Sequence, residues 1–216
     1  MEDNDEVLHM KYEWKKQDKQ LYLPKNKPEL IEVPSMDFFM LAGKGNPNEG
    51  PFSEVIGVLY SLSYAVKMMP KSGITPEGYF DYTVFPLEGV WDLEEKARAK
   101  DKLDKDKLIY TLMIRQPSFV SKELAQTVIE NTKKKKPHDL LQNVEFKSSE
   151  DSLCVQMLHI GSYDDEPASF ALMEEFCNSN GLKRKSKVHK EIYISDFRKT
   201  QPEKLKTVLR FKVERL

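Results

Sequence analysis

The order of apolar segments in the sequence repeats once, and this repeat limits the folds that the chain can adopt. In the first copy, a strand that is apolar on both faces is expected at residues 37–44, followed by a loop rich in Gly and Pro. Apolar residues at three- and four-residue steps then predict an amphipathic helix at residues 52–69. Two further strands are expected at residues 79–88 and 108–115.

The second copy follows the same plan. A strand at residues 153–160 leads into a loop that again contains Gly and Pro, and a helix follows at residues 168–179. Two strands at residues 188–194 and 206–213 complete the copy. A repeat of this size indicates duplication. Two such halves placed side by side can cover each other's sheet edges and leave a groove between them.

The repeat also suggests how the chain is divided. Residues 1–34 are expected to form an N-terminal arm that packs on a domain comprising residues 35–216. Within that domain the first half spans about residues 35–118, a linking helix lies within residues 119–150, and the second half spans about residues 151–216. Lysines and aromatic residues alternate in the arm, which could indicate nucleic-acid binding, but acidic residues dilute the charge and prolines favour an extended path along the domain.

Composition excludes several classes of protein. Charged residues make up 32% of the chain, yet the net charge is -1, so no overall field attracts nucleic acid or an anionic membrane. No segment is apolar for long enough to span a bilayer, and the acidic first residues do not resemble a secretory signal. Cys154 and Cys177 fit neither a disulfide framework nor a metal motif. We expect a cytoplasmic protein with no cofactor, no membrane partner and no direct nucleic-acid partner, and a homodimer is compatible with the sequence.

The strand at residues 188–194 carries the first candidate site. Its alternation places His189, Glu191 and Tyr193 on one face. A carboxylate between an imidazole and a phenol is costly to bury unless it has partners, so this face is a candidate for binding or acid–base chemistry. The alternative is an exposed strand carboxylate paired with a lysine such as Lys206, and the residues alone leave both interpretations open.

A second acid and a group of aromatic residues complete the candidate pocket. Glu88 lies at the end of the corresponding strand in the first half, although it could simply precede the turn at Gly89. Aromatic side chains with one or two carboxylates and no metal-ligand spacing predict a pocket for a flat, apolar or cationic molecule. The aromatic candidates are Tyr60, Tyr64, Tyr82, Trp91, Phe119, Tyr163 and Tyr193. His159 is a further ligand-binding candidate, against the alternative of a structural imidazole.

Three motifs resemble one known family. Residues 157–167 (MLHIGSYDDEP) and residues 189–210 (HKEIYISDFRKTQPEKLKTVLR) are similar to the corresponding parts of GyrI-like small-molecule-binding domains, and the resemblance extends over roughly residues 37–213. The family implies an α+β fold of two pseudo-symmetric β-α-β-β halves, a duplicated SH2-like motif. The halves would form a central antiparallel sheet with helices on one side and a groove between them.

The resemblance also implies roles for particular residues. The family's pocket glutamate corresponds to Glu191. Residues 86–91 (PLEGVW) resemble a stand-alone branch in which some members hydrolyse the cyclopropane of cyclopropanoid DNA-alkylating antibiotics. On that basis Glu191 and Glu88 would position or deprotonate water, and Tyr163 or Tyr193 would hydrogen-bond the dienone carbonyl. Trp91 would stack on the substrate together with Tyr60.

The sequence therefore leaves three functional hypotheses. The first is a hydrolase that opens a strained ring in a flat aromatic or hydrophobic small molecule. The second is a non-catalytic protein that binds, sequesters or senses such molecules. The third is a module that docks a protein partner through its groove or its lysine-rich helix end, which the near-neutral net charge disfavours.

Overall fold

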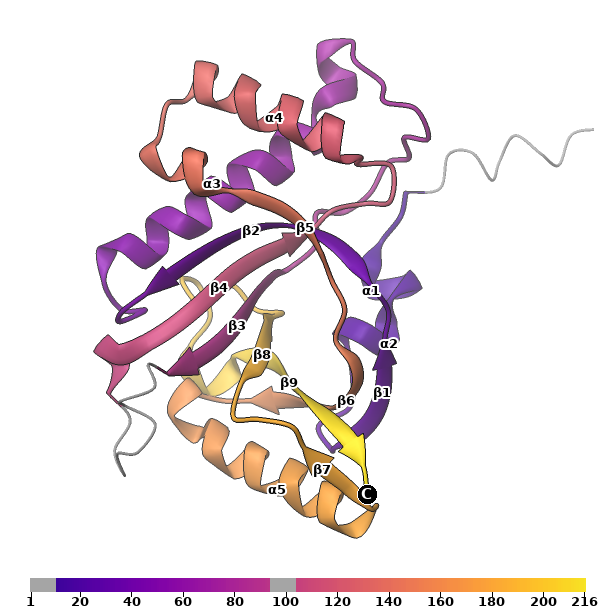
Figure 1. Ribbon diagram of the computed structural model, residues 1–216, viewed down its shortest axis with the longest axis vertical. Coiled ribbons are helices and arrows are strands. Elements are labelled where there is room, and N and C mark those ends of the chain that lie inside the picture. The colour runs from indigo at the N-terminus through magenta and orange to yellow at the C-terminus, as the bar shows by residue number, and fades with distance from the viewer. Residues whose placement is uncertain (1–10, 94–103) are drawn as a thin grey trace, which may run out of the picture.

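The two halves of the chain have the same strand order and meet at the middle of one curled sheet. A computed structural model describes residues 11–93 and 104–216. Its nine strands form an antiparallel sheet in the order β1-β6-β9-β8-β3-β4-β2-β5, with β7 paired to β9 (Figure 1). Counted outwards from the centre, the first half has the order β3, β4, β2 and the second half has the order β8, β9, β6. In each half these are the second, third and first of its three long strands in chain order. The β3–β8 pair joins the halves.

The first half begins with an apolar strand and a long helix, and a second long helix follows it in the linking segment. The first half contains β2 (Met36–Lys44), α3 (Gly50–Lys67), β3 (Leu87–Leu93) and β4 (Leu108–Arg115), and the linking segment contains α4 (Lys122–Lys135) and β5 (Glu145–Ser149). Pro51 lies in the first turn of α3, where its missing N–H costs nothing. The Ser121 hydroxyl accepts a hydrogen bond from the Leu124 amide and so caps α4, and lysines in the last turn complement the helix dipole.

The second half repeats this arrangement with a single long helix. Its elements are β6 (Ser152–Ile160), α5 (Glu166–Ser179), β7 (Leu182–Arg184), β8 (His189–Tyr193) and β9 (Lys206–Arg215). Short 3-10 helices occur in all parts of the domain, at Met69–Ser72, Lys105–Lys107, Asp139–Asn143, Tyr163–Asp165 and Pro202–Lys204. Gly181, with φ +61°, follows the end of α5 in the left-handed conformation that glycine adopts without strain.

The described part of the N-terminal arm is folded rather than extended throughout. It contains α1 (Trp14–Gln17), α2 (Lys19–Tyr22) and β1 (Glu29–Val33). β1 extends the sheet by pairing with β6, and the side chains of Trp14 and Tyr22 are almost fully buried. The arm therefore supplies an edge strand to the second half, while Trp14 donates to the Val84 carbonyl and Tyr22 packs against Phe85 of the first half.

The predicted strand at residues 79–88 is wrong. Residues 79–86 are irregular except for one isolated bridge between Tyr12 and Tyr82, and β3 begins at Leu87. The aromatic residues of this stretch pack against one another and against Phe119 instead of alternating across a sheet. β5 and β7 were not predicted, because both are short and few of their residues are apolar.

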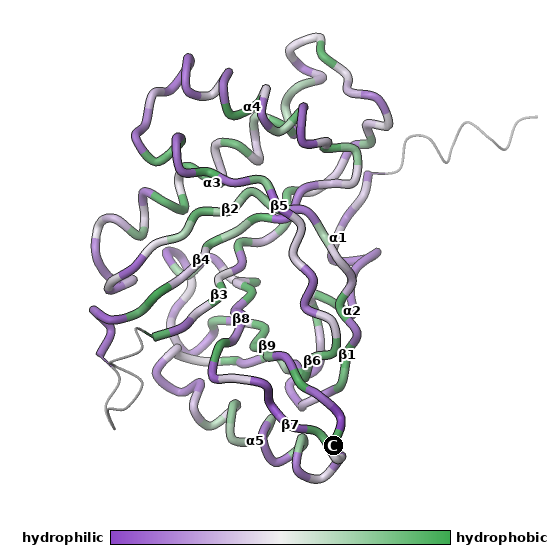
Figure 2. Tube along the Cα trace, viewed as in Figure 1, coloured by the Kyte–Doolittle hydropathy of each residue, from purple (hydrophilic) through white to green (hydrophobic). Residues whose placement is uncertain are grey.

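The sheet has two faces with different coverings. Phe39 on β2 and Leu112 on β4 share the face that packs under α3, and Met157 on β6 and Leu209 on β9 continue that face under α5. We call it the helical face, and the other the opposite face. The hydropathy colouring shows apolar stretches along β2, β4 and parts of α3, and hydrophilic stretches along much of α4 (Figure 2). Fold class and helices on one side of the sheet are as predicted.

Candidate functional site

The candidate site lies on the central strand pair, where the two halves meet. In the register of β3 and β8, Gly89 is opposite Glu191 and Trp91 is opposite His189. Paired residues of antiparallel strands project their side chains to the same face, so these residues and Tyr193 all lie on the helical face. The gap between α3 and α5 leaves this part of the face open to a ligand.

A cavity of about 410 Å³ occupies that gap, a size suited to a small organic molecule. Both halves of the chain contribute to its walls. It is lined by Pro47, Asn48, Phe52, Trp91, Asp92, Leu93, Lys105, Leu108, Tyr163, Asp164, Glu166, Pro167, Phe170, Lys187, His189, Glu191, Tyr193 and Phe197. Most of the wall is aromatic or aliphatic, and the acids Glu166 and Glu191 are its most buried polar groups.

A chain of hydrogen bonds holds Glu191 in place. The indole Nε1–H of Trp91 donates to the Tyr193 hydroxyl at 2.8 Å, and that hydroxyl donates to Glu191 Oε2 at 2.7 Å. His189 Nε2 lies 3.0 Å from Glu191 Oε1. Glu191 is 9% exposed and both of its oxygens have partners.

A second acid faces Glu191 from the first turn of α5. Glu166 is 7% exposed, and its Oε1 has no hydrogen-bond partner among the described residues. Burial, the charge of Glu191 and a hydrogen bond to Glu191 together raise the pKa of Glu166 to about 10, with burial the largest cause. Glu166 is therefore a neutral carboxylic acid at physiological pH, beside the carboxyl group of Glu191. Two acids held in different protonation states can act as proton donor and acceptor.

Tyr163 brings a third polar group to the cavity. Its ring meets the Tyr193 ring edge-on, with centroids 6.2 Å apart. Burial raises the pKa of Tyr163 well above its usual value, and the charges of Glu191 and Glu166 add to the effect. Its hydroxyl makes no hydrogen bond to another described residue, so it is a neutral donor available to a ligand.

The same acids could hold a cation. One donor atom from each of Glu166, His189 and Glu191 lies within 4.8 Å of the others. However, the donors of His189 and Glu191 already bond to each other, and burial favours a proton on Glu166. A shared proton accounts for the arrangement among the described residues without requiring an ion.

Glu88 lies on the opposite face of the sheet from Glu191. Glu88 is opposite Ile192, one residue out of step with the Gly89–Glu191 pair, so the alternation of side chains turns it away from the cavity. It is fully buried, 3.3 Å from Lys190 Nζ, and accepts a hydrogen bond from the Tyr22 hydroxyl at 3.4 Å. The structure therefore does not bring the two predicted acids together.

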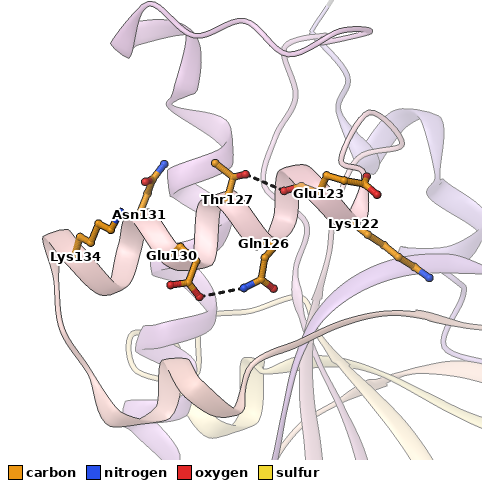
Figure 3. A pocket seen from close by; sticks show the side chains of 7 residues that line it. All are labelled: Lys122, Glu123, Gln126, Thr127, Glu130, Asn131 and Lys134. Atoms are coloured by element: carbon orange, nitrogen blue, oxygen red, sulfur yellow. Dashed lines mark hydrogen bonds between the residues drawn. The ribbon is translucent and has the colours of Figure 1, made fainter.

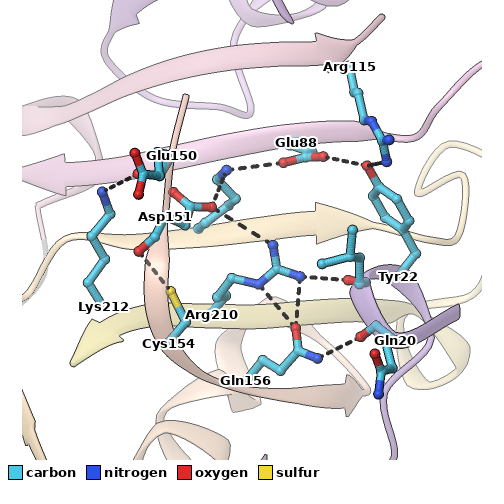
Figure 4. A network of polar contacts seen from close by, with 12 residues as sticks. Gln20, Tyr22, Glu88, Arg115, Glu150, Asp151, Cys154, Gln156, Arg210 and Lys212 are labelled. Carbon is cyan, nitrogen blue, oxygen red and sulfur yellow. Dashed lines mark hydrogen bonds and ion pairs between the residues drawn. The ribbon is translucent and has the colours of Figure 1, made fainter. Parts of the chain in front are cut away.

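Glu88 belongs to a buried network of alternating charges (Figure 4). Lys190 Nζ also lies 2.6 Å from Asp151, and Arg210 lies 3.9 Å from the same carboxylate. Burial alone would raise the pKa of Asp151, but the charge and hydrogen bond of Lys190 hold it below its usual value. Arg210 donates to Gln156 at 2.8 Å and to the Leu21 carbonyl at 2.6 Å, which ties the N-terminal arm to the sheet.

Four predicted aromatic residues lie outside the cavity. Tyr60 and Tyr64 pack together on α3 with ring centroids 6.3 Å apart, and Tyr64 is 53% exposed. Tyr82 and Phe119 belong to the aromatic cluster of residues 79–86. None of the four lines the cavity.

His159 also has a structural environment. Its Nδ1 lies 2.9 Å from the Ser169 hydroxyl and its Nε2 lies 2.9 Å from the Ser162 carbonyl oxygen. The ring is 4% exposed and does not line the cavity. Both ring nitrogens are satisfied by α5 and the loop before it, so the imidazole fixes the loop that carries Tyr163.

A shallow hollow on α4 differs from this cavity in its lining residues and in its exposure to solvent. All seven residues that line it come from α4, and its polar side chains bond along the helix, as between Gln126 Nε2 and Glu130 Oε1 at 3.0 Å (Figure 3). It is an exposed, solvated helix face.

Sequence reasoning missed Glu166 and Phe170. The loop prediction ended at Pro167, although proline is favoured in the first turn of a helix. Starting the helix at that proline would have placed Glu166 at its N-terminus and Phe170 one turn later, on the side that meets the His189 ring at 4.8 Å. That Glu166 faces Glu191 depends on how α5 packs on the sheet.

The comparisons agree with this fold. The chain belongs to the family of GyrI-like small molecule binding domains, whose model matches residues 26–214. Searches among curated proteins gave no match. No helix in the described ranges is long and apolar enough to cross a membrane.

Solved structures resemble the chain over nearly its whole length. A hydrolase from Listeria innocua is 37% identical, with a TM-score of 0.85 over 94% of this chain and 100% of that one. A second Listeria innocua hydrolase is 38% identical, with a TM-score of 0.87 over 95% and 100%. The C-terminal domain of EcmrR is 14% identical, with a TM-score of 0.51 over 88% and 98%, a likeness of fold alone.

Proposed function

We propose that this protein is a hydrolase that opens the strained ring of flat, cyclopropanoid DNA-alkylating compounds and so protects the cell from them. The observation that carries the proposal is the pairing of Glu166 with Glu191 inside an aromatic cavity. The Listeria hydrolases of similar sequence support the reaction class. The choice of substrate rests on the resemblance of residues 86–91 and on the flat, apolar walls of the cavity.

In the addition of water, Glu191 would be the proton acceptor and Glu166 the proton donor. Glu191 accepts a proton from water as the water oxygen bonds to a ring carbon, and the ring carbon–carbon bond breaks. The electron pair of that bond moves to the dienone oxygen, which takes a proton from Glu166 or Tyr163. The net change is the addition of one water, and transfer of a proton from Glu191 back to the donor restores the starting state. Positioned acid–base groups of this kind contribute about 10²–10⁴-fold in rate.

The proposal replaces Glu88 by Glu166 as the partner of Glu191. Tyr163 keeps its predicted place beside the substrate, since its hydroxyl is free to donate. Phe52 and Phe170 would contact the flat body of the substrate from α3 and α5.

The test is mass spectrometry of a cyclopropanoid indole antibiotic incubated with the purified protein and with its Glu191→Gln variant. A product heavier by one water from the wild type, reduced by 100-fold or more in the variant, is the expected result. Glu175→Gln changes an exposed acid on α5 and serves as the matched control, with turnover like the wild type. Equal turnover by wild type and Glu191→Gln would contradict the proposal.

A second candidate function is binding without chemistry, for sequestration or sensing. It is favoured by the buried Glu191 carboxylate among aromatic rings, a combination that suits cationic ligands. Calorimetry with a cationic aromatic dye and a neutral analogue would distinguish it. Binding of both without any product, with Glu191→Gln weakening the cation alone, would favour the binder.

A further inference from the structure

The indole of Trp91 has little ring surface to offer a ligand. The residue is 5% exposed, and its ring packs against Phe52 at 5.8 Å and Tyr110 at 5.3 Å between centroids. The stacking role expected from the sequence would use only the part of the ring that reaches the cavity. Its nitrogen, in contrast, is fully engaged at the centre of the site, where it donates to Tyr193.

That hydrogen bond has only one possible direction. An indole N–H donates and cannot accept, so the Tyr193 oxygen must be the acceptor at this contact. The hydroxyl is then left to place its own proton elsewhere, and Glu191 Oε2 is the acceptor within reach, at 2.7 Å. A donor on the phenol oxygen polarises the phenol O–H and strengthens the next bond in the chain.

We propose that Trp91 is a positioning residue that acts on Glu191 through Tyr193. Its N–H fixes the Tyr193 hydroxyl as a donor to Glu191, and so keeps that carboxyl group oriented for its role as a base. The inference rests on the proposed function of Glu191. It assigns to the Trp91 nitrogen a part in the reaction that the ring surface alone would not have.

Two further observations support the relay. A Cβ atom on residue 89 would lie 2.8 Å from Trp91 Nε1 and 3.2 Å from the Tyr193 hydroxyl, so the relay exists only because this strand position is Gly. Burial raises the pKa of Tyr193 well above its usual value, and the charge of Glu191 raises it too, whereas the hydrogen bond from Trp91 lowers it. Trp91 thus makes Tyr193 a better donor.

The experiment compares Trp91→Phe, Tyr193→Phe and the double variant. We expect Trp91→Phe to keep KM within about threefold, to lower kcat about tenfold, and to move the acidic limb of the pH–kcat profile upward. Since Trp91 acts through Tyr193, the double variant should match Tyr193→Phe alone. Tyr110→Phe removes a hydroxyl from the ring beside Trp91 and is the control, with an unchanged profile. Additive losses with an unmoved acidic limb would overturn the inference.

A second readout does not depend on turnover. The indole Nε1–H resonance of Trp91 should be shifted downfield and protected from exchange in the wild type, and should lose both properties in Tyr193→Phe. An indole proton that keeps its shift and protection in Tyr193→Phe would overturn the relay. If the wild type hydrolyses nothing, the proposed function fails, while this measurement still decides whether the hydrogen bond exists.

Discussion

The two faces of the β3–β8 pair bury acids in opposite ways. On the opposite face, Glu88 and Asp151 share the ammonium of Lys190, with Arg210 nearby, so each negative charge has a positive neighbour. On the helical face, Glu191 faces another acid, Glu166, and no lysine or arginine lies between them among the described residues. In the first arrangement each buried negative charge has a positive partner. In the second, a proton on Glu166 removes one of the two negative charges.

This difference suits the two groups of acids to different roles, one structural and one chemical. A buried ion network with matched charges holds its elements together and resists change, because removing one partner leaves another charge uncompensated. A buried pair of acids has its protonation divided between two sites, which suits proton transfer. Residues 88 and 191 come from neighbouring strands of one sheet, yet the alternation of side chains assigns them to these different environments.

The largest expected effect comes from removing the transferable proton on the helical face. Glu166→Gln keeps the shape of the side chain but cannot donate a carboxylic proton, so we expect turnover to fall about 10²–10⁴-fold. Below about pH 4.5, where Glu166 is protonated in both the folded and the unfolded chain, the free energy of unfolding should change little. Steady-state kinetics and urea denaturation measure both quantities. A large loss of stability with normal turnover per folded molecule would assign Glu166 a structural role.

The matching change on the opposite face should reverse that pattern. Lys190→Met leaves Glu88 and Asp151 without their shared cation, and we expect about 3–5 kcal/mol of destabilisation. Adding Glu88→Gln to this variant should restore part of the loss, since one of the stranded charges is removed. Chemical denaturation tests both variants. If Lys190→Met were as stable as the wild type, the network would contribute nothing to the fold.

The third expected effect is a dependence of stability on pH. The folded chain keeps the Glu166 proton up to a pKa of about 10, whereas the unfolded chain releases it near 4.5. The stability due to this group is therefore complete below about 4.5, declines as pH rises and is gone above about 10, with a slope of at most about 1.4 kcal/mol per pH unit.

Glu166→Gln removes this titrating group and provides the control. Between pH 6 and pH 9 the melting temperature of the wild type should fall more steeply than that of Glu166→Gln. Differential scanning calorimetry at about three pH values in this range is sufficient. Parallel curves for the two proteins would show that Glu166 ionises normally in the folded state, and would weaken the contrast between the faces.

Local sequence determined much of the fold. Apolar periodicity predicted α3 and α4, the strands β2, β4, β6, β8 and β9, and the repeated order of elements, because burial of one helix stripe or one strand face leaves a direct signal. The same reasoning misread residues 79–86, since aromatic residues packed in a cluster resemble a strand in composition. It also ended the strand at residue 88 and left a turn at Gly89 open, although a glycine within a strand can instead mark a close approach by neighbouring side chains.

By itself the sequence determined that His189, Glu191 and Tyr193 share one strand face, because the period of a strand is two residues. Which acid would meet Glu191 was decided only by tertiary structure. The register of β3 against β8 turned Glu88 away, and the packing of α5 brought in Glu166, which lies 25 positions earlier in the chain. The face of a strand to which a side chain points is set by the local sequence. Its partner across a cavity is set by how separate elements pack, and no short stretch of sequence carries that information.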